Sequence, residues 1–107
     1  MKKTVGLPIL FVMLSAFGFA QDLGQVKNDI DAERFDTAKK TLKTLIKSNP
    51  DNGKFYFYLG DVYLAQKESD SALAVFNKGL LAKDKGFLSN IGLAQLDLDA
   101  KKNADAV

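Results

Sequence analysis

The residues of this chain whose types and spacing could do chemistry are carboxylates in closely spaced pairs. Asp29 and Asp31 form one pair, Glu33 extends it, and Asp97 and Asp99 form another. Two carboxylates that face each other can hold a metal ion or share acid–base work. Residues two apart on a helix point about 200° away from each other, so none of these pairs forms a pincer. We therefore interpret them as parts of solvent-exposed helix faces.

The residue types that most often perform catalysis are missing. The chain has no Cys, no His and no Trp. Without Cys there is no disulfide, no thiolate nucleophile and no thiolate metal site. Without His the usual general base near neutral pH is absent. We therefore predict that the protein is not an enzyme and that it uses neither a metal nor any other cofactor.

Composition and charge indicate one small helical domain. The chain has 107 residues, of which 47% are hydrophobic and 26% charged, as is typical of globular proteins. Its two prolines leave long uninterrupted stretches, which favours helices. The net charge of +2 comes from Lys2 and Lys3, because the rest of the chain has 13 basic and 13 acidic residues. No basic stripe is present, so we do not expect a nucleic-acid partner.

The first twenty residues, MKKTVGLPILFVMLSAFGFA, have the layout of a secretory signal peptide. Two lysines precede an apolar run, and small residues lead up to Ala20. We predict a signal peptide over residues 1–20, cleavage after Ala20, and a periplasmic or secreted bacterial protein that starts at Gln21. The alternative is an uncleaved anchor, because the charge-free stretch 4–21 is at the lower limit for a bilayer span. After cleavage we expect no stable membrane span.

An internal period of 34 residues runs through the rest of the chain. Ala38, Ala72 and Ala106 are spaced at this interval, and so are Asp36 and Asp70. Each period is expected to form two helices, at about 23–33 and 36–48, then 54–66 and 71–82, then 87–99 and 104–107. The segment SNPDNG, residues 48–53, is rich in turn formers and separates the first two periods. The sequence thus predicts one domain over 21–107, with units at about 21–52, 53–86 and an incomplete 87–107.

The second unit carries the motifs W-x-x-L-G-x-x-Y and A-x-x-x-F, with tyrosine in place of the tryptophan. The residues that match are Tyr56, Leu59, Gly60, Tyr63, Ala72 and Phe76. In this the chain resembles the tetratricopeptide repeat family. The resemblance implies an all-α fold, an α-α superhelix of about two and a half helical hairpins. The chain departs from the pattern at three positions, with Gly79 for Ala, Asp84 for Pro and Asp97 for Tyr.

Gly60 and Ala72 are expected to face each other where the two helices of the second unit cross. Helix axes approach to about 8–10 Å, and the closest point admits only small side chains. The aromatic run from Phe55 to Tyr58 belongs to a helix that is apolar nearly all round, which is typical of a helix between neighbours. We expect Phe55 and Tyr56 in the core.

The resemblance also implies a groove that binds a partner, lined by the first helix of each unit. The groove residues expected by spacing are Lys27, Ile30, Lys54, Phe57, Asp61, Leu64, Ile91 and Gln95, together with Leu23, Asp31, Ala65, Leu88, Leu98 and Asp99. Members that capture a peptide carboxylate have a key lysine where this chain has Leu23, Phe57 and Ile91. The implied ligand is therefore a more apolar segment or helix of a partner protein. The alternative is that further repeats cover these residues.

The predicted function is a non-catalytic protein–protein interaction scaffold of the bacterial cell envelope. The alternative is a set of spacer or capping repeats in a larger envelope-assembly or nutrient-uptake accessory protein. Because the third unit lacks most of its second helix, the apolar face of residues 87–98 should be partly uncovered. A truncated longer array would explain this better than self-association through that face.

Overall fold

The fold consists of helices joined by short turns. The structure is a computed structural model and describes residues 22–105, so the predicted signal peptide lies outside the described residues. A first helix covers residues 22–31. It is followed by α2 (Phe35–Ser48), α3 (Gly53–Ala65), α4 (Ser69–Gly79) and α5 (Leu88–Asp105). The described residues form no sheet, which confirms the predicted all-α class.

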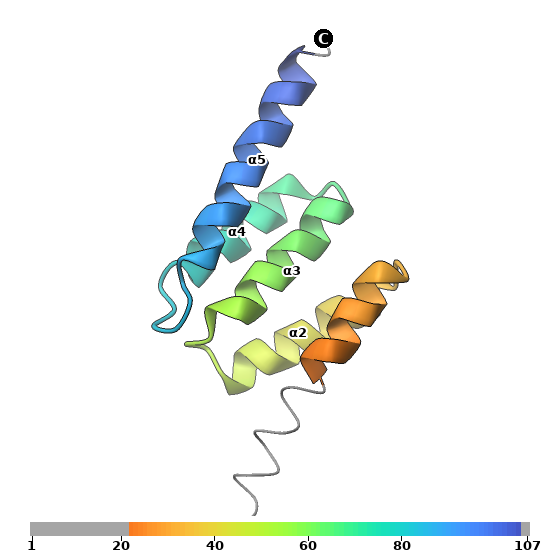
Figure 1. The fold of residues 1–107 in the computed structure, drawn as a ribbon, viewed down its shortest axis with the longest axis vertical. Helices are drawn as coiled ribbons and strands as arrows, with labels where there is room; N and C mark the ends of the chain where they lie inside the picture. The colour runs from red at the N-terminus through yellow and green to blue at the C-terminus, as the bar shows by residue number, and fades with distance from the viewer. Residues whose placement is uncertain (1–21, 106–107) are drawn as a thin grey trace, which may run out of the picture.

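The helices lie in two layers (Figure 1). The first helix, α3 and α5 form the layer nearer the viewer, and α2 and α4 lie behind them. Helix α3 is central, because it packs against α2, α4 and α5. This arrangement explains why α3 is apolar nearly all round, since a helix with neighbours on several sides has little face left for water.

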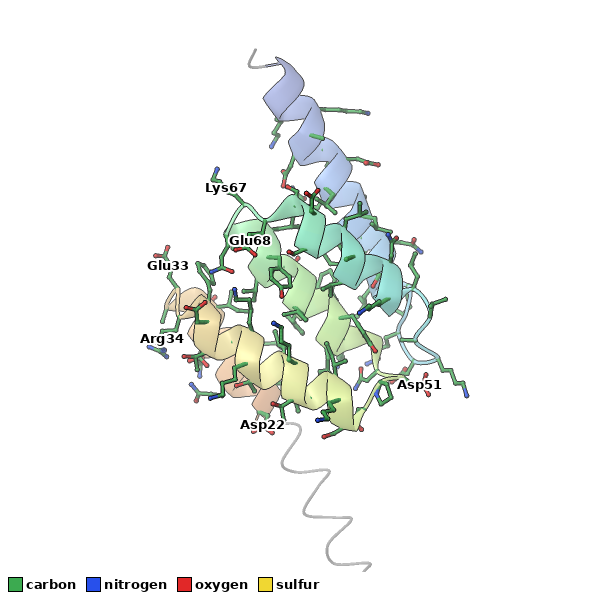
Figure 2. The ribbon with its side chains drawn as sticks, turned by 180° about the vertical axis from the view of Figure 1, so that it is seen from behind. Asp22, Glu33, Arg34, Asp51, Lys67 and Glu68 are labelled. Atoms are coloured by element: carbon green, nitrogen blue, oxygen red, sulfur yellow. The ribbon has the colours of Figure 1, made fainter. Side chains whose placement is uncertain are left out.

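The turns inside the first two units have the same construction. Glu33 and Lys67, 34 residues apart, both have positive φ angles, of 60° and 61°. In each turn the next N–H donates to the carbonyl five residues back, Arg34 to Asp29 at 2.7 Å and Glu68 to Tyr63 at 2.9 Å. These bonds satisfy carbonyls that a helix end otherwise leaves unpaired. Figure 2 shows both turns at the same edge of the molecule, opposite Asp51.

The third unit has no such turn within the described residues. Lys101 stands where Glu33 and Lys67 stand in the earlier units, yet α5 continues through it to Asp105. The expected helix end near Asp99 is therefore wrong. Ala and Lys dominate residues 100–102 and favour helix, whereas a turn would place a non-glycine residue at positive φ. In units one and two the helix after the turn packs on α3 and offsets that cost.

The loops that end the first two units are joined by backbone hydrogen bonds. The Gly53 N–H donates to the Asp84 carbonyl at 2.7 Å, and the Asp84 N–H donates to the Asp51 carbonyl at 3.0 Å. Proline at position 84, which the resemblance implies, would lack the N–H of this second bond. Asp84 in place of proline therefore allows this second backbone hydrogen bond to form. Asn52 caps α3 by accepting from the Lys54 N–H at 3.1 Å.

The core lies between the layers. Its apolar members are Val26, Ala38, Leu42, Leu45, Phe55, Leu59, Val62, Ala72 and Phe76. Phe55 is therefore in the core as expected. Tyr56 is half-buried, and its hydroxyl donates to the Pro50 carbonyl at 2.8 Å.

Phe76 of α4 lies against a glycine on each of two other helices. A Cβ atom added to Gly60 of α3 would meet the Phe76 ring closer than van der Waals contact allows, and so would one added to Gly92 of α5. The three atoms nearest to a Cβ at Gly60 belong to Phe76, and the expected approach of Gly60 to Ala72 stays a prediction. Ala72 is fully buried, one helical turn before Phe76 on α4. The Phe76 ring uses the space that each glycine leaves.

We predict that Gly60→Ala and Gly92→Ala each lower the free energy of unfolding by about 1–3 kcal/mol, because the new methyl group displaces the Phe76 ring. Urea unfolding monitored by helical circular dichroism measures this. Gly24→Ala is the matched control, since an added Cβ there meets nothing within 4 Å. It should raise stability by up to about 1 kcal/mol through helix propensity. If all three substitutions stabilise the protein, the described packing of Phe76 is wrong.

Candidate functional site

The groove residues expected from the sequence lie on the first helix, α3 and α5, which form one layer (Figure 1). We call this surface the groove face. It is defined by Lys27, Lys54, Asp61, Leu64, Ile91, Gln95, Leu98 and Asp99. All of these side chains are exposed or half-buried, so a ligand can reach each of them.

One end of the groove face is basic. Interaction with the neighbouring Lys85 ammonium lowers the pKa of Lys54, burial and the charge of Lys27 lower it less, and Asp84 opposes them. The Lys27 ammonium also lies 5.6 Å from the centre of the Tyr58 ring. Three ammonium groups from the first helix, α3 and the loop before α5 therefore gather here. Such a cluster attracts a carboxylate or another anion.

The Phe57 side chain is less exposed to solvent than its predicted place in the groove implied. Its side chain is half-buried, and its ring centre lies 6.5 Å from that of Phe76 and 5.6 Å from that of Tyr58. Phe57 therefore supports the packing around Phe76 and offers a ligand only part of its surface. A charge introduced at this position would disturb the fold as well as any binding.

Asp61 places a half-buried carboxyl in the middle of α3. Burial raises its pKa to about 6, from an ordinary value of 3.8. No side chain among residues 22–102 forms an ion pair or hydrogen bond with it. A carboxylate that is partly removed from water and unpaired interacts strongly with an incoming cation or N–H donor. Asp61 is therefore a candidate partner for a cationic or N–H group of a ligand.

The other end of the groove face contains a hollow of about 400 Å³. It is lined by Leu64 and Ala65 of α3, by Asp99 and Lys102 of α5, by Lys67 of the turn, and by Ser69 at the start of α4. Gln95 donates a hydrogen bond to Asp99 at 2.9 Å, which holds that carboxylate in place. The structure thus brings together Leu64, Ala65 and Asp99, which the sequence assigned to two different units.

The apolar residues expected in the groove divide into two groups. Ile91 and Leu98 on α5 are 56% and 53% exposed, as the incomplete third unit predicted. Leu23 and Ile30 on the first helix are half-buried against the core, so they offer a ligand little surface. The open apolar part of the groove face therefore belongs mainly to α5.

Two basic residues of this surface were not found from the sequence. Lys85 lies in a loop, and Lys102 lies in the part of α5 that was not expected to be helical. The 34-residue spacing carries no signal for either of them, because it assigns groove positions only within the first helix of each unit.

The closely spaced carboxylates of the first helix differ in their surroundings. Between residues 22 and 105 no group of three His, Cys, Asp or Glu residues could hold a metal ion. Asp29 is not on a solvent-exposed face as expected, because it is only 1% exposed. It accepts hydrogen bonds from Arg34 and Gln25, each at 3.0 Å. Asp31 is exposed, so the two carboxylates do point apart.

We predict that Asp61 makes the protein less stable as the pH rises. Its pKa is higher in the folded chain than in the unfolded chain, so the folded state binds the proton more tightly between about pH 4 and pH 6. Asp61→Asn should therefore be more stable than the parent by about 1 kcal/mol near pH 7.5, where water partly screens the charge. Near pH 4.5 the difference should largely vanish. Urea unfolding at both pH values tests this, and an unchanged difference would show that Asp61 is not the group responsible.

Comparison with known proteins agrees with this architecture. A family model described as tetratricopeptide repeat matches residues 23–86, more than half of the 107-residue chain. The matched segment contains nearly all of the first helix together with α2, α3 and α4, and α5 follows it. No curated protein and no solved structure matches the chain. The family match and the repeated helical hairpins lead to one conclusion: the chain belongs to the tetratricopeptide repeat family.

Proposed function

We propose that this protein is a non-catalytic scaffold of the bacterial cell envelope that binds a segment of a partner protein across its groove face. Tetratricopeptide repeats generally mediate protein–protein interaction. The observation that carries the proposal is the half-buried, unpaired carboxyl of Asp61 at the centre of this surface. An unpaired group of this kind lowers stability, so its presence is best explained by a ligand that pairs with it.

The chemistry of the groove face defines the ligand that would fit. The exposed side chains of Ile91 and Leu98 suit an apolar residue of the ligand. Asp61 and Asp99 suit a lysine, an arginine or another N–H donor next to it. The cluster of Lys27, Lys54 and Lys85 suits a carboxylate further along. The ligand is thus a segment with apolar and basic residues near one end and an acidic group at the other, which sets its direction on the groove face.

The proposed location in the envelope is inferred from the predicted signal peptide and not from the folded part of the chain. The layout of residues 1–20 supports export and cleavage after Ala20. None of the helices between residues 22 and 105 has the length and apolar character needed to cross a bilayer.

A second candidate function is a spacer or capping unit of a larger envelope-assembly or nutrient-uptake accessory protein. The exposed apolar residues Phe87, Ile91 and Leu98 of α5 support it, because a further repeat or a second copy of the chain would cover them. In that case the groove face would bind no separate ligand, and its apolar part would be buried in the assembly.

We predict that the exported protein begins at Gln21. The intact mass of the protein purified from the envelope or the culture medium tests this directly. A mass that includes residues 1–20 would support the uncleaved anchor instead.

We predict that Ile91→Asp abolishes ligand selection by the groove face, because a charge replaces the exposed apolar contact. Selection of peptides from a random phage-displayed library measures this. The parent should enrich peptides that combine apolar and basic residues, and Asp61→Asn should weaken the preference for basic residues. Leu73→Asp is the control, since Leu73 is 46% exposed on α4 and lies outside the groove face.

The control variant should select the same peptides as the parent. If Ile91→Asp also selects them, the groove face is not the binding surface. If the parent selects none, the spacer function is favoured.

A further inference from the structure

The back of the molecule carries a second hollow, away from the groove face. Figure 2 shows this side, with α2 and α4 nearest the viewer and α3 visible between them. Helices α2 and α4 each pack against α3. A hollow of about 260 Å³ lies among the three helices. We call it the back hollow and define it by Lys43, Ile46, Tyr56, Leu59, Tyr63, Val75 and Lys78, which line it.

The floor of the back hollow is apolar and aromatic. Leu59 is buried, and Ile46 and Val75 are half-buried from opposite sides. The Tyr56 ring is anchored by the hydrogen bond of its hydroxyl to Pro50. The volume is below the roughly 300–1,000 Å³ typical of small-molecule sites. The hollow therefore suits one or two apolar side chains of a peptide better than a whole metabolite.

The rim of the back hollow is basic. Lys43 of α2 and Lys78 of α4 line it from opposite sides, and both are exposed. The Lys39 ammonium lies 5.3 Å from the centre of the Tyr63 ring. Helix α2 as a whole contains four lysines and one aspartate. The rim thus has a positive potential that complements an acidic ligand.

Few carboxylates of the protein itself neutralise this rim. Asp36 lies 3.5 Å from the Lys39 ammonium and pairs with it. Asp51 is near the Tyr56 ring, since its charge adds to burial in raising the pKa of that hydroxyl. Among the described residues Lys43 and Lys78 form no ion pair within 4 Å.

The repeat accounts for the floor of the back hollow, because Tyr56, Leu59 and Tyr63 belong to the family motif, but it does not account for the lysine rim. A shift of 34 residues carries Tyr56 to Asn90 and Tyr63 to Asp97, both polar, and it carries Lys43 to Asn77. The combination of aromatic floor and lysine rim is therefore specific to the junction of the first two units. A lysine rim required only for stacking of the units would be expected in both registers.

We propose that the back hollow binds an acidic segment of a partner protein that inserts at least one apolar side chain between α2 and α4. The apolar side chain contacts Ile46, Leu59 and Val75. Acidic residues of the segment pair with Lys43 and Lys78 on either side. This surface is separate from the groove face, so the protein holds two partner segments at once, one on each layer of helices.

The test is a titration of the isotope-labelled purified protein with three short synthetic peptides, followed by NMR. One peptide alternates Leu and Glu, one alternates Leu and Lys, and one alternates Ser and Glu. The Leu–Glu peptide should shift the signals of Ile46, Tyr63 and Val75, and its binding should weaken at high salt because the rim is exposed. The other two peptides should bind at least about tenfold more weakly.

Two matched variants test whether the charge at the rim of the back hollow contributes to peptide binding. Lys43→Glu should weaken binding of the Leu–Glu peptide about tenfold or more. Lys40→Glu makes the same charge change on α2 at an exposed residue that does not line the hollow, and it should have a much smaller effect. Equal effects of the two variants would overturn the proposal, because they would reveal attraction by net charge alone.

Three other results would also overturn the proposal. The first is equal binding of the Leu–Lys peptide, and the second is a set of shifts confined to the groove face. The third is no shift with any peptide up to about 1 mM, where even weak contacts are detected. Shifts of the same signals in the free protein that depend on its concentration would identify a second copy of this chain as the occupant, in place of the proposed partner.

Discussion

The close approach of three helices around one aromatic ring is the constraint on which the rest of the structure depends. Phe76 is fully buried, and Gly60 and Gly92 leave the space that its ring occupies. A ring of this size contributes about 1.5–3 kcal/mol through burial, which exceeds the roughly 1 kcal/mol that one glycine costs a helix. Because Phe76 belongs to α4 and lies against α3 and α5, its side chain helps to set the position of the last helix. The exposure of Ile91 and the hollow beside Asp99 both follow from that position.

The same packing determines the electrostatics of the groove face. Helix α3 has neighbours on several sides, so Asp61 in its middle loses part of its contact with water, and its pKa rises. Lys54 at the start of α3 is half-buried and lies near Lys27 and Lys85. A surface with a half-buried carboxyl in its middle and ammonium groups at one end would recognise the proposed ligand by its pattern of charges. Recognition of this kind needs neither His nor Cys, which agrees with the absence of both from the chain.

Two layers of helices present two different surfaces, and α3 contributes to both of them. Its Asp61 and Leu64 belong to the groove face, and its Tyr56 and Tyr63 form part of the floor of the back hollow. A central helix that is apolar nearly all round thus supports the stacking of the units and supplies apolar contacts on either side. The polar residues that distinguish the two surfaces come largely from the flanking helices, above all from the lysines of α2.

The sequence by itself determined the helical hairpins, their 34-residue register and the positions of the first two turns. For α2 the expected 36–48 and the observed Phe35–Ser48 differ by one residue, because turn formers and apolar periodicity act within a few residues along the chain. Only the tertiary structure decided that Asp29 is buried beside Arg34, that Phe57 packs toward Phe76, and that α5 runs past Lys101. The tertiary structure also places Lys85 near Lys54, and it places Lys43 and Lys78 on opposite sides of the back hollow. These outcomes depend on which distant helix covers a given face, and the pattern of residues within one helix does not specify its neighbour.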